Sequence, residues 1–154
     1  MIINSDNKAA FFLENTVDSG VFNRLFADLG IPVPKFHDAN YRLNVKDYSI
    51  FMKALFNSGF LAPAESEYAL SLLTRSQFKV GLVKELPDSV AVAHKFGESG
   101  NSMVNELHET GLVYFGHRAY LITIMTKGHD WARQAQIISR ISKLTYNNMI
   151  NINN

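Results

Sequence analysis

Two short motifs contain the residues of this sequence that are best suited to chemistry. Ser5-Asp6-Asn7 lies near the start of the chain, and Lys95-Phe96-Gly97 follows the apolar run Val90 to Ala93. A serine hydroxyl both donates and accepts a hydrogen bond, an asparagine carboxamide offers a donor and an acceptor together, and a lysine ammonium supplies positive charge. Such groups suit proton transfer and the recognition of a carboxylate.

Taken alone, each motif has a simpler interpretation. A specified tripeptide occurs by chance in about one chain in fifty of this length, and Asp6 is an ordinary N-cap for a helix. By itself, Lys95 is more commonly a solvated lysine at the end of a strand. The elements around the motifs must therefore decide between these interpretations.

The first 86 residues favour helices. Helical spacing of apolar residues, N-caps and terminal glycines predict four of them, over Asp6 to Leu13, Asp18 to Leu29, Asn44 to Gly59 and Pro63 to Leu73. The prolines of Ile31-Pro32-Val33-Pro34 force an extended segment, because each disfavours helix in the residue before it. That segment begins a loop that runs to about Arg42.

After Pro87 the apolar period changes from helix to strand. We expect strands over Val90 to Phe96, Leu107 to Phe115 and Ala119 to Lys127, joined by turns at Gly100 and Gly116 and therefore antiparallel. A last helix is predicted from Asp130 to Tyr146, and the asparagine-rich tail after it should be frayed. The prediction is one α+β domain over residues 1–154, with a helical lobe (1–86) and a three-stranded antiparallel sheet plus a C-terminal helix (87–154).

Composition narrows the class of partner. The 154 residues carry 15 Lys and Arg against 14 Asp and Glu, so the net charge of +1 favours neither nucleic acid nor a membrane surface. No apolar run is long enough to span a membrane, and the absence of cysteine excludes disulfides and thiolate metal sites. We expect a small molecule or another polypeptide as the partner, and no cofactor.

The motifs and their order resemble two of the three active-site motifs of class A beta-lactamases and penicillin-binding serine hydrolases. The likeness continues through scaffold segments over essentially the whole chain, at Tyr48 to Leu61, Ser66 to Leu70, Gly81-Leu82 and His108 to Tyr114. The resemblance implies a truncated beta-lactamase or transpeptidase fold. It also implies acyl transfer through a serine ester, on a beta-lactam or a D-alanyl peptide, in a parent protein that is exported.

The resemblance assigns roles to the matching positions. Ser5 would relay a proton to the departing nitrogen, and Lys95 would supply positive charge for the substrate carboxylate. The backbone N–H of Glu98 would form half of an oxyanion hole. Asn7 would hold the amide side chain of the substrate, and Gly97 would leave the strand edge bare for it.

Two positions depart from the family pattern. Phe96 stands where the family usually has a Thr or Ser hydroxyl, so a hydrogen bond to the substrate carboxylate is lost and recognition of an ordinary penicillin is weakened. Asn40-Tyr41-Arg42-Leu43-Asn44 stands where class A enzymes carry Glu-x-x-Leu-Asn. Asn40 cannot act as the base that activates the deacylating water, so either the loop is shorter or turnover differs.

The nucleophile is the main difference from the family. In the family, the Ser-x-x-Lys motif that carries the nucleophile lies upstream of the Ser-Asp-Asn loop. Here only Met1 to Asn4 precede Ser5. The expectation is a C-terminal portion that is inactive alone, or a noncatalytic relative that binds a peptide, a cell-wall fragment or a partner chain. Ser76-Gln77-Phe78-Lys79 has the Ser-x-x-Lys spacing, but it follows Ser5 in the sequence, whereas the family places its nucleophile before that loop. Ser76 is therefore not favoured as the nucleophile.

The remaining expectations concern metals and self-association. The histidines show no His-x-x-x-His spacing, so no metal site is expected, and His94 is expected to pack beside Lys95. In the resembled fold, further strands pair beside the last strand of this chain. Residues 119–127 should therefore form a bare edge, so the chain is expected either to self-associate through it or to be marginally stable.

Overall fold

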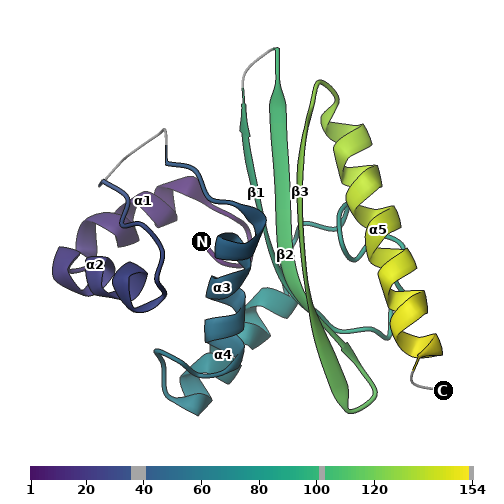
Figure 1. Cartoon of the computed structure of the whole chain (residues 1–154), viewed down its shortest axis with the longest axis horizontal. Helices are drawn as coiled ribbons and strands as arrows, with labels where there is room; N and C mark the ends of the chain where they lie inside the picture. The colour runs from purple at the N-terminus through teal and green to yellow at the C-terminus, as the bar shows by residue number, and fades with distance from the viewer. Residues whose placement is uncertain (36–40, 101–102, 153–154) are drawn as a thin grey trace.

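The computed structural model describes residues 1–35, 41–100 and 103–152. Within them lie five helices and three strands, shown in Figure 1. The helices are α1 (Asn7–Thr16), α2 (Ser19–Asp28), α3 (Val45–Phe56), α4 (Pro63–Thr74) and α5 (Trp131–Asn151). The strands are β1 (Val92–Gly100), β2 (Asn105–Phe115) and β3 (Arg118–Gly128).

Side-chain caps determine where four of the helices begin. A carboxylate or amide oxygen of the residue before the helix accepts the backbone N–H three positions later, which satisfies a donor that the helix itself cannot pair. These caps are Asp6, Asp18, Asn44 and Asp130, on α1, α2, α3 and α5. Helix α4 instead begins with Pro63, whose fixed φ suits the first helical position.

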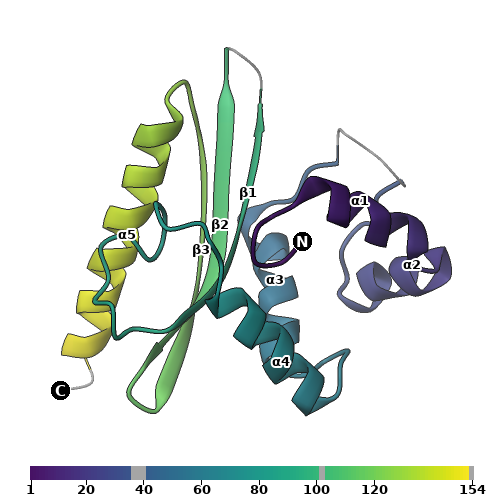
Figure 2. The same ribbon diagram turned by 180° about the vertical axis from the view of Figure 1, so that it is seen from behind.

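The three strands form one antiparallel sheet in the order β1-β2-β3. Helices α3 and α4 lie on one face and α5 on the other, as Figures 1 and 2 show from opposite sides. Because strand side chains alternate between faces, Ala93 and Leu112 point toward α3 and α4, whereas Val92 and Val113 point toward α5. The predicted α+β class with a three-stranded antiparallel sheet is confirmed.

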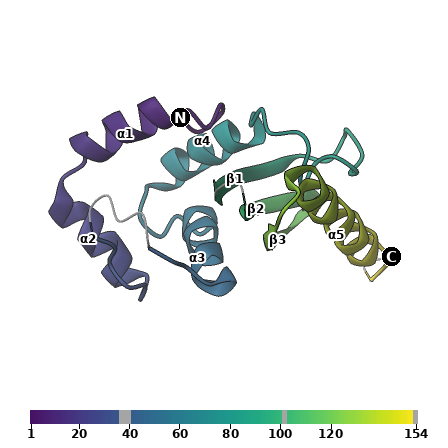
Figure 3. The same ribbon diagram turned by 90° about the horizontal axis from the view of Figure 1, so that it is seen from above.

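The sheet separates two apolar cores. The larger core fills the space between the sheet, α5 and the segment after α4, and the smaller one lies between the sheet, α3 and α4. The larger contains Phe78, Leu82, Leu86, Val92, Leu107, Val113, Ile122, Ile124, Ala135 and Ile138. The smaller contains Met52, Leu70, Leu73, Ala93 and Leu112. Helices α1 and α2 lie at the periphery, farthest from the sheet (Figure 3).

Two boundaries differ from the sequence prediction by four residues or more. Strand β1 continues four residues past Phe96 to Gly100, so Gly97 and Glu98 lie inside a paired strand. Helix α5 continues to Asn151, so the asparagine-rich tail is helical through that residue. No described helix is both long and apolar enough to cross a bilayer.

Candidate functional site

Strand β1 lies at the edge of the described sheet, and the candidate site lies along its outer side. The Tyr114 N–H donates to the Ala91 carbonyl at 2.9 Å, just before β1. Bonded and non-bonded residue pairs alternate along an antiparallel ladder. The backbone groups of His94, Phe96 and Glu98 therefore point away from β2, and the Glu98 N–H is directed outward from the sheet.

The Lys95 side chain joins the two sequence motifs at this edge. Its Nζ donates to Ser5 Oγ at 2.6 Å and to the outward-facing Phe96 carbonyl at 2.7 Å. Ser5 has a φ of 52°, in the left-handed region that costs free energy for a residue with a side chain. The preceding segment is tied to the core because the Gln77 N–H donates to the Ile3 carbonyl at 3.0 Å.

The environment of Lys95 suits it to proton transfer. Partial burial lowers the pKa of the Lys95 ammonium below its ordinary value of 10.5, while the negative charge of Glu109 acts in the opposite direction. Ser5 Oγ accepts from Lys95, so its own hydrogen is directed elsewhere. This arrangement can pass a proton from the amine through the hydroxyl to a group bound at the edge of β1.

A buried polar network lies behind Lys95, on the α5 side of the sheet. Glu109 is fully buried, its Oε1 accepts from Nδ1 of the equally buried His94 at 2.6 Å, and its Oε2 accepts from the Leu82 N–H at 2.9 Å. A Cβ on Gly81 would stand 1.9 Å from Oε2, so only glycine allows this close approach. The network ties β1, β2 and the segment after α4 to one another.

The expectation that His94 packs beside Lys95 is wrong. Successive strand residues point to opposite faces, so His94 lies in the larger core while Lys95 faces the helical lobe. Glu109 was not among the predicted site residues. The available signal was the position of Glu109 in the alternation of β2, on the same face as Leu107 and Val113, where a carboxylate is unusual because a buried charge needs a partner.

The other predicted site residues lie around the Ser5–Lys95 contact. Asn7 is exposed and is the first residue of α1, and a Cβ on Gly97 would meet open space, which leaves that part of the strand bare. The Phe96 ring stacks on Phe78 with centroids 3.9 Å apart and an interplanar angle of 15°. Lys95 Nζ lies 4.6 Å from the centroid of the Phe96 ring.

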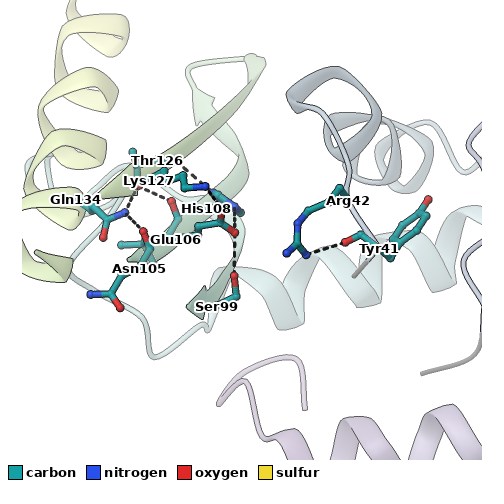
Figure 4. Close-up of polar contacts among 10 residues, drawn as sticks. Tyr41, Arg42, Ser99, Asn105, Glu106, His108, Thr126, Lys127 and Gln134 are labelled. Carbon is teal, nitrogen blue, oxygen red and sulfur yellow. Dashed lines mark hydrogen bonds and ion pairs between the residues drawn. The ribbon is translucent and has the colours of Figure 1, made fainter. Parts of the chain in front are cut away.

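A second polar cluster lies beyond the site, at the turn end of β1 and β2 (Figure 4). Glu106 accepts from Ser99 at 3.0 Å and pairs with Lys127 at 3.6 Å and His108 at 4.0 Å. The Ser99 hydrogen bond lowers the pKa of Glu106, and the charges of Lys127, His108 and Arg42 lower it further against the effect of burial. Arg42 extends toward this cluster from the loop before α3.

Other candidates from the sequence do not form a site. Ser76 is buried, and its Oγ accepts from the Phe78 N–H while Lys79 is exposed. Ser5 and Lys8 also have the Ser-x-x-Lys spacing, but the amine that contacts Ser5 is that of Lys95. In the described part of the chain, no group of side chains could hold a metal ion. Asn40 and His37 lie outside the described residues.

The stability of the site region should fall steeply at alkaline pH. Burial, and then the charge of Glu109, raise the pKa of Tyr48 to about 12. Between pH 10 and 12 the unfolded chain loses this proton while the folded chain keeps it, so each pH unit lowers the free energy of unfolding by about 1.4 kcal/mol. We expect Tyr48→Phe to reduce this loss in urea unfolding at pH 9 to 11.5. The exposed Tyr68→Phe is the control, and an equal effect of both would contradict the assignment.

Solved structures with this fold include beta-lactamases. The chain is 17% identical to a beta-lactamase from Chitinophaga pinensis, with a TM-score of 0.81 over 94% of this chain and 61% of that one. It is 18% identical to a beta-lactamase from Sphaerobacter thermophilus, with a TM-score of 0.72 over 90% of this chain and 56% of that one. For PBP-A, the identity is 17% and the TM-score 0.68, over 84% and 50% of the two chains.

These likenesses show the fold, and the chain spans between 50% and 61% of the length of these three structures. Among curated proteins, none matches the sequence significantly. The model of the beta-lactamase enzyme family matches residues 1–149, which is nearly the whole chain. The chain therefore belongs to the beta-lactamase enzyme family.

Proposed function

We propose that this chain supplies the substrate-binding side of a serine acyl-transfer site, acting on a beta-lactam or a D-alanyl peptide. The observation that carries this proposal is the 2.6 Å contact between Lys95 Nζ and Ser5 Oγ. It joins residues 90 positions apart at an outward-facing strand edge. The serine that forms the ester lies, in this proposal, outside these 154 residues.

Each group at the edge has a defined task in the proposal. Lys95 attracts the substrate carboxylate, and Ser5 passes a proton to the departing nitrogen. The outward backbone of β1 at Phe96 and Glu98 pairs with an extended substrate, and Gly97 leaves room for it. The Glu98 N–H is one donor to the oxyanion, and Asn7 holds the substrate amide.

A structure of similar fold supports the reaction type. A PBP-A variant, 17% identical to this chain with a TM-score of 0.67, was solved as an acyl-enzyme complex with penicillin G. That finding describes PBP-A. In this chain, it supports a beta-lactam as the probe with which to test the edge of β1.

A second candidate function is binding without catalysis. It is favoured by Phe96, which places an aromatic ring beside Lys95 where a hydroxyl would assist a penicillin. A stacked ring next to a lysine suits a ligand with an apolar group, such as a peptide or a cell-wall fragment. In this second candidate function, the ligand still binds at the edge of β1, but no serine ester forms.

Binding of penicillin G to the 154-residue chain tests the proposal. We expect its addition to shift the backbone amide signals of Gly97 and Glu98, and Lys95→Met to weaken binding by about tenfold or more, since a charged hydrogen bond contributes about 1.5–3 kcal/mol. The exposed Lys79→Met is the matched control and should bind as the unaltered chain does. Unchanged affinity in Lys95→Met would contradict the assignment of Lys95.

Mass measurement separates the two functions and locates the nucleophile. After incubation with penicillin G, the intact chain should show no added mass, because the proposal places the nucleophilic serine outside it. A penicilloyl adduct on Ser76 or Ser5 would contradict that placement. Binding of a neutral peptide amide at the edge of β1, undiminished by Lys95→Met, would favour the noncatalytic candidate instead.

A further inference from the structure

Strand β1 carries two opposite charges near its outer edge that could neutralise each other. Lys95 leaves the strand toward the helical lobe, but its ammonium donates to the outward-facing Phe96 carbonyl at 2.7 Å and lies 4.6 Å from the centroid of the Phe96 ring. Glu98 is exposed and follows Phe96 on the same face of the strand, about 6.6 Å further along. A glutamate side chain is long enough to cover most of that distance.

The structure does not pair these two charges. In the described part of the chain, Lys95 donates to the Ser5 hydroxyl and the Phe96 carbonyl, and no carboxylate lies within ion-pair distance of its ammonium. The Glu98 carboxylate instead accepts the indole N–H of Trp131 at 2.8 Å. The Glu98 side chain is therefore directed toward the first turn of α5, and the Lys95 charge has no anionic partner at this edge.

The position of Trp131 is fixed by the elements around it. Trp131 is the first residue of α5, and the cap of this helix, Asp130, accepts the Arg133 N–H at 3.0 Å. The rings of Trp131 and Phe78 meet edge to face, with centroids 6.0 Å apart and an interplanar angle of 89°. Phe78 in turn stacks on Phe96. The indole N–H consequently has a defined direction from which to hold Glu98.

Packing alone does not account for the indole N–H. A phenylalanine at position 131 could keep an aromatic contact with Phe78, but it has no donor for Glu98. The hydrogen bond to an exposed carboxylate also contributes little to folding, because water screens charged groups at the surface. Its larger consequence lies at the edge of β1, where it determines which partner the Glu98 carboxylate takes.

We propose that Trp131 is a positioning residue for carboxylate binding, because it holds Glu98 and so keeps the Lys95 ammonium available to a ligand. This inference rests on the proposed function, in which Lys95 attracts the substrate carboxylate. Without the indole N–H, the Glu98 carboxylate would pair with Lys95 and repel an anionic ligand at the same edge. Trp131 thus controls affinity for a carboxylate without touching the ligand.

Titration of penicillin G into Trp131→Phe tests this inference. We expect affinity to fall about three- to fivefold, the upper range for an exposed ion pair that competes with the ligand. The ratio of the two affinities should shrink between about 0.02 M and 0.5 M salt, because screening weakens the competing pair. The methyl ester of penicillin G, which has no carboxylate, is the matched ligand and should bind both chains with equal, weaker affinity.

A double-mutant cycle identifies Glu98 as the cause. In the Glu98→Gln background the side chain carries no charge to pair with Lys95, so Trp131→Phe should change affinity by less than about 1.5-fold. Urea unfolding checks that each variant folds. An equal loss in both backgrounds would show that Trp131 acts through packing and would overturn the inference, as would unchanged affinity in Trp131→Phe alone.

Measurements without ligand separate this inference from the proposed function. Trp131 is the single tryptophan, so its indole N–H gives one NMR signal, which should move and exchange faster with water in Glu98→Ala. A crystal structure of Trp131→Phe should show the Glu98 carboxylate within about 4 Å of the Lys95 ammonium. If penicillin G does not bind the unaltered chain, the proposed function fails and these two measurements still decide. An indole signal insensitive to Glu98→Ala, or no pairing of Glu98 with Lys95 in that crystal, would overturn the role of Trp131.

Discussion

Replacing Glu109 with alanine is expected to lower the free energy of unfolding by about 3–5 kcal/mol, the usual cost of removing one partner from a buried pair. The carboxylate is fully buried and accepts from both His94 Nδ1 and the Leu82 N–H. Alanine would leave both donors without their acceptor in the buried interior. Small domains have about 5–15 kcal/mol of stability in total, so the variant should be close to unfolding in urea titrations.

Two comparison variants make this prediction decisive. Glu109→Gln retains an acceptor oxygen and should lose clearly less stability than alanine does. Glu106→Ala removes a carboxylate from the same strand, but its partners Ser99 and Lys127 lie in an exposed cluster, so the loss should be much smaller than that of Glu109→Ala. Equal losses for Glu109→Ala and Glu106→Ala would show that burial of the network is not what stabilises the fold.

Local signals were enough to predict the order and type of the elements. Asp6, Asp18 and Asn44 each cap the helix that the sequence placed after them, because capping depends only on residues three positions apart. The strands were identified by their apolar period. The fold class followed from these two kinds of evidence together.

Boundaries were less predictable where tertiary contacts outweigh local preference. Beyond Phe96, β1 becomes exposed and loses its apolar alternation, yet it stays paired with β2 as far as Gly100. At the end of α5, the asparagines predicted fraying, since asparagine has a low helix propensity. The helix nevertheless continues, and Tyr146 packs against the larger core before that extension.

The site was predictable only in part, for a similar reason. The structure brings Ser5 and Lys95 together, whereas the roles assigned to them from the family resemblance remain predictions. The Glu109 network could not be found from sequence because its partners lie 15 and 27 positions away. No local spacing rule connects such residues, and only the sheet register brings them into contact.

Phe96→Thr is expected to move stability and ligand affinity in opposite directions. The Phe96 ring stacks on Phe78 and packs against the larger core. Losing part of that burial and the ring contact should cost about 2–3 kcal/mol of unfolding free energy. Lys95 Nζ lies 4.6 Å from the ring centroid, so a threonine hydroxyl there would be near the group that we propose binds a carboxylate.

That hydroxyl should strengthen binding of penicillin G by about tenfold, since a hydrogen bond to a charged group contributes about 1.5–3 kcal/mol. Phe96→Leu is the matched control, because it loses the stack on Phe78 without adding a donor. It should lose stability without gaining affinity when both are measured by urea unfolding and ligand titration. If Phe96→Leu binds penicillin G as tightly as Phe96→Thr does, the gain comes from removing the ring, and Phe96 obstructs the edge of β1 instead of merely lacking a hydroxyl.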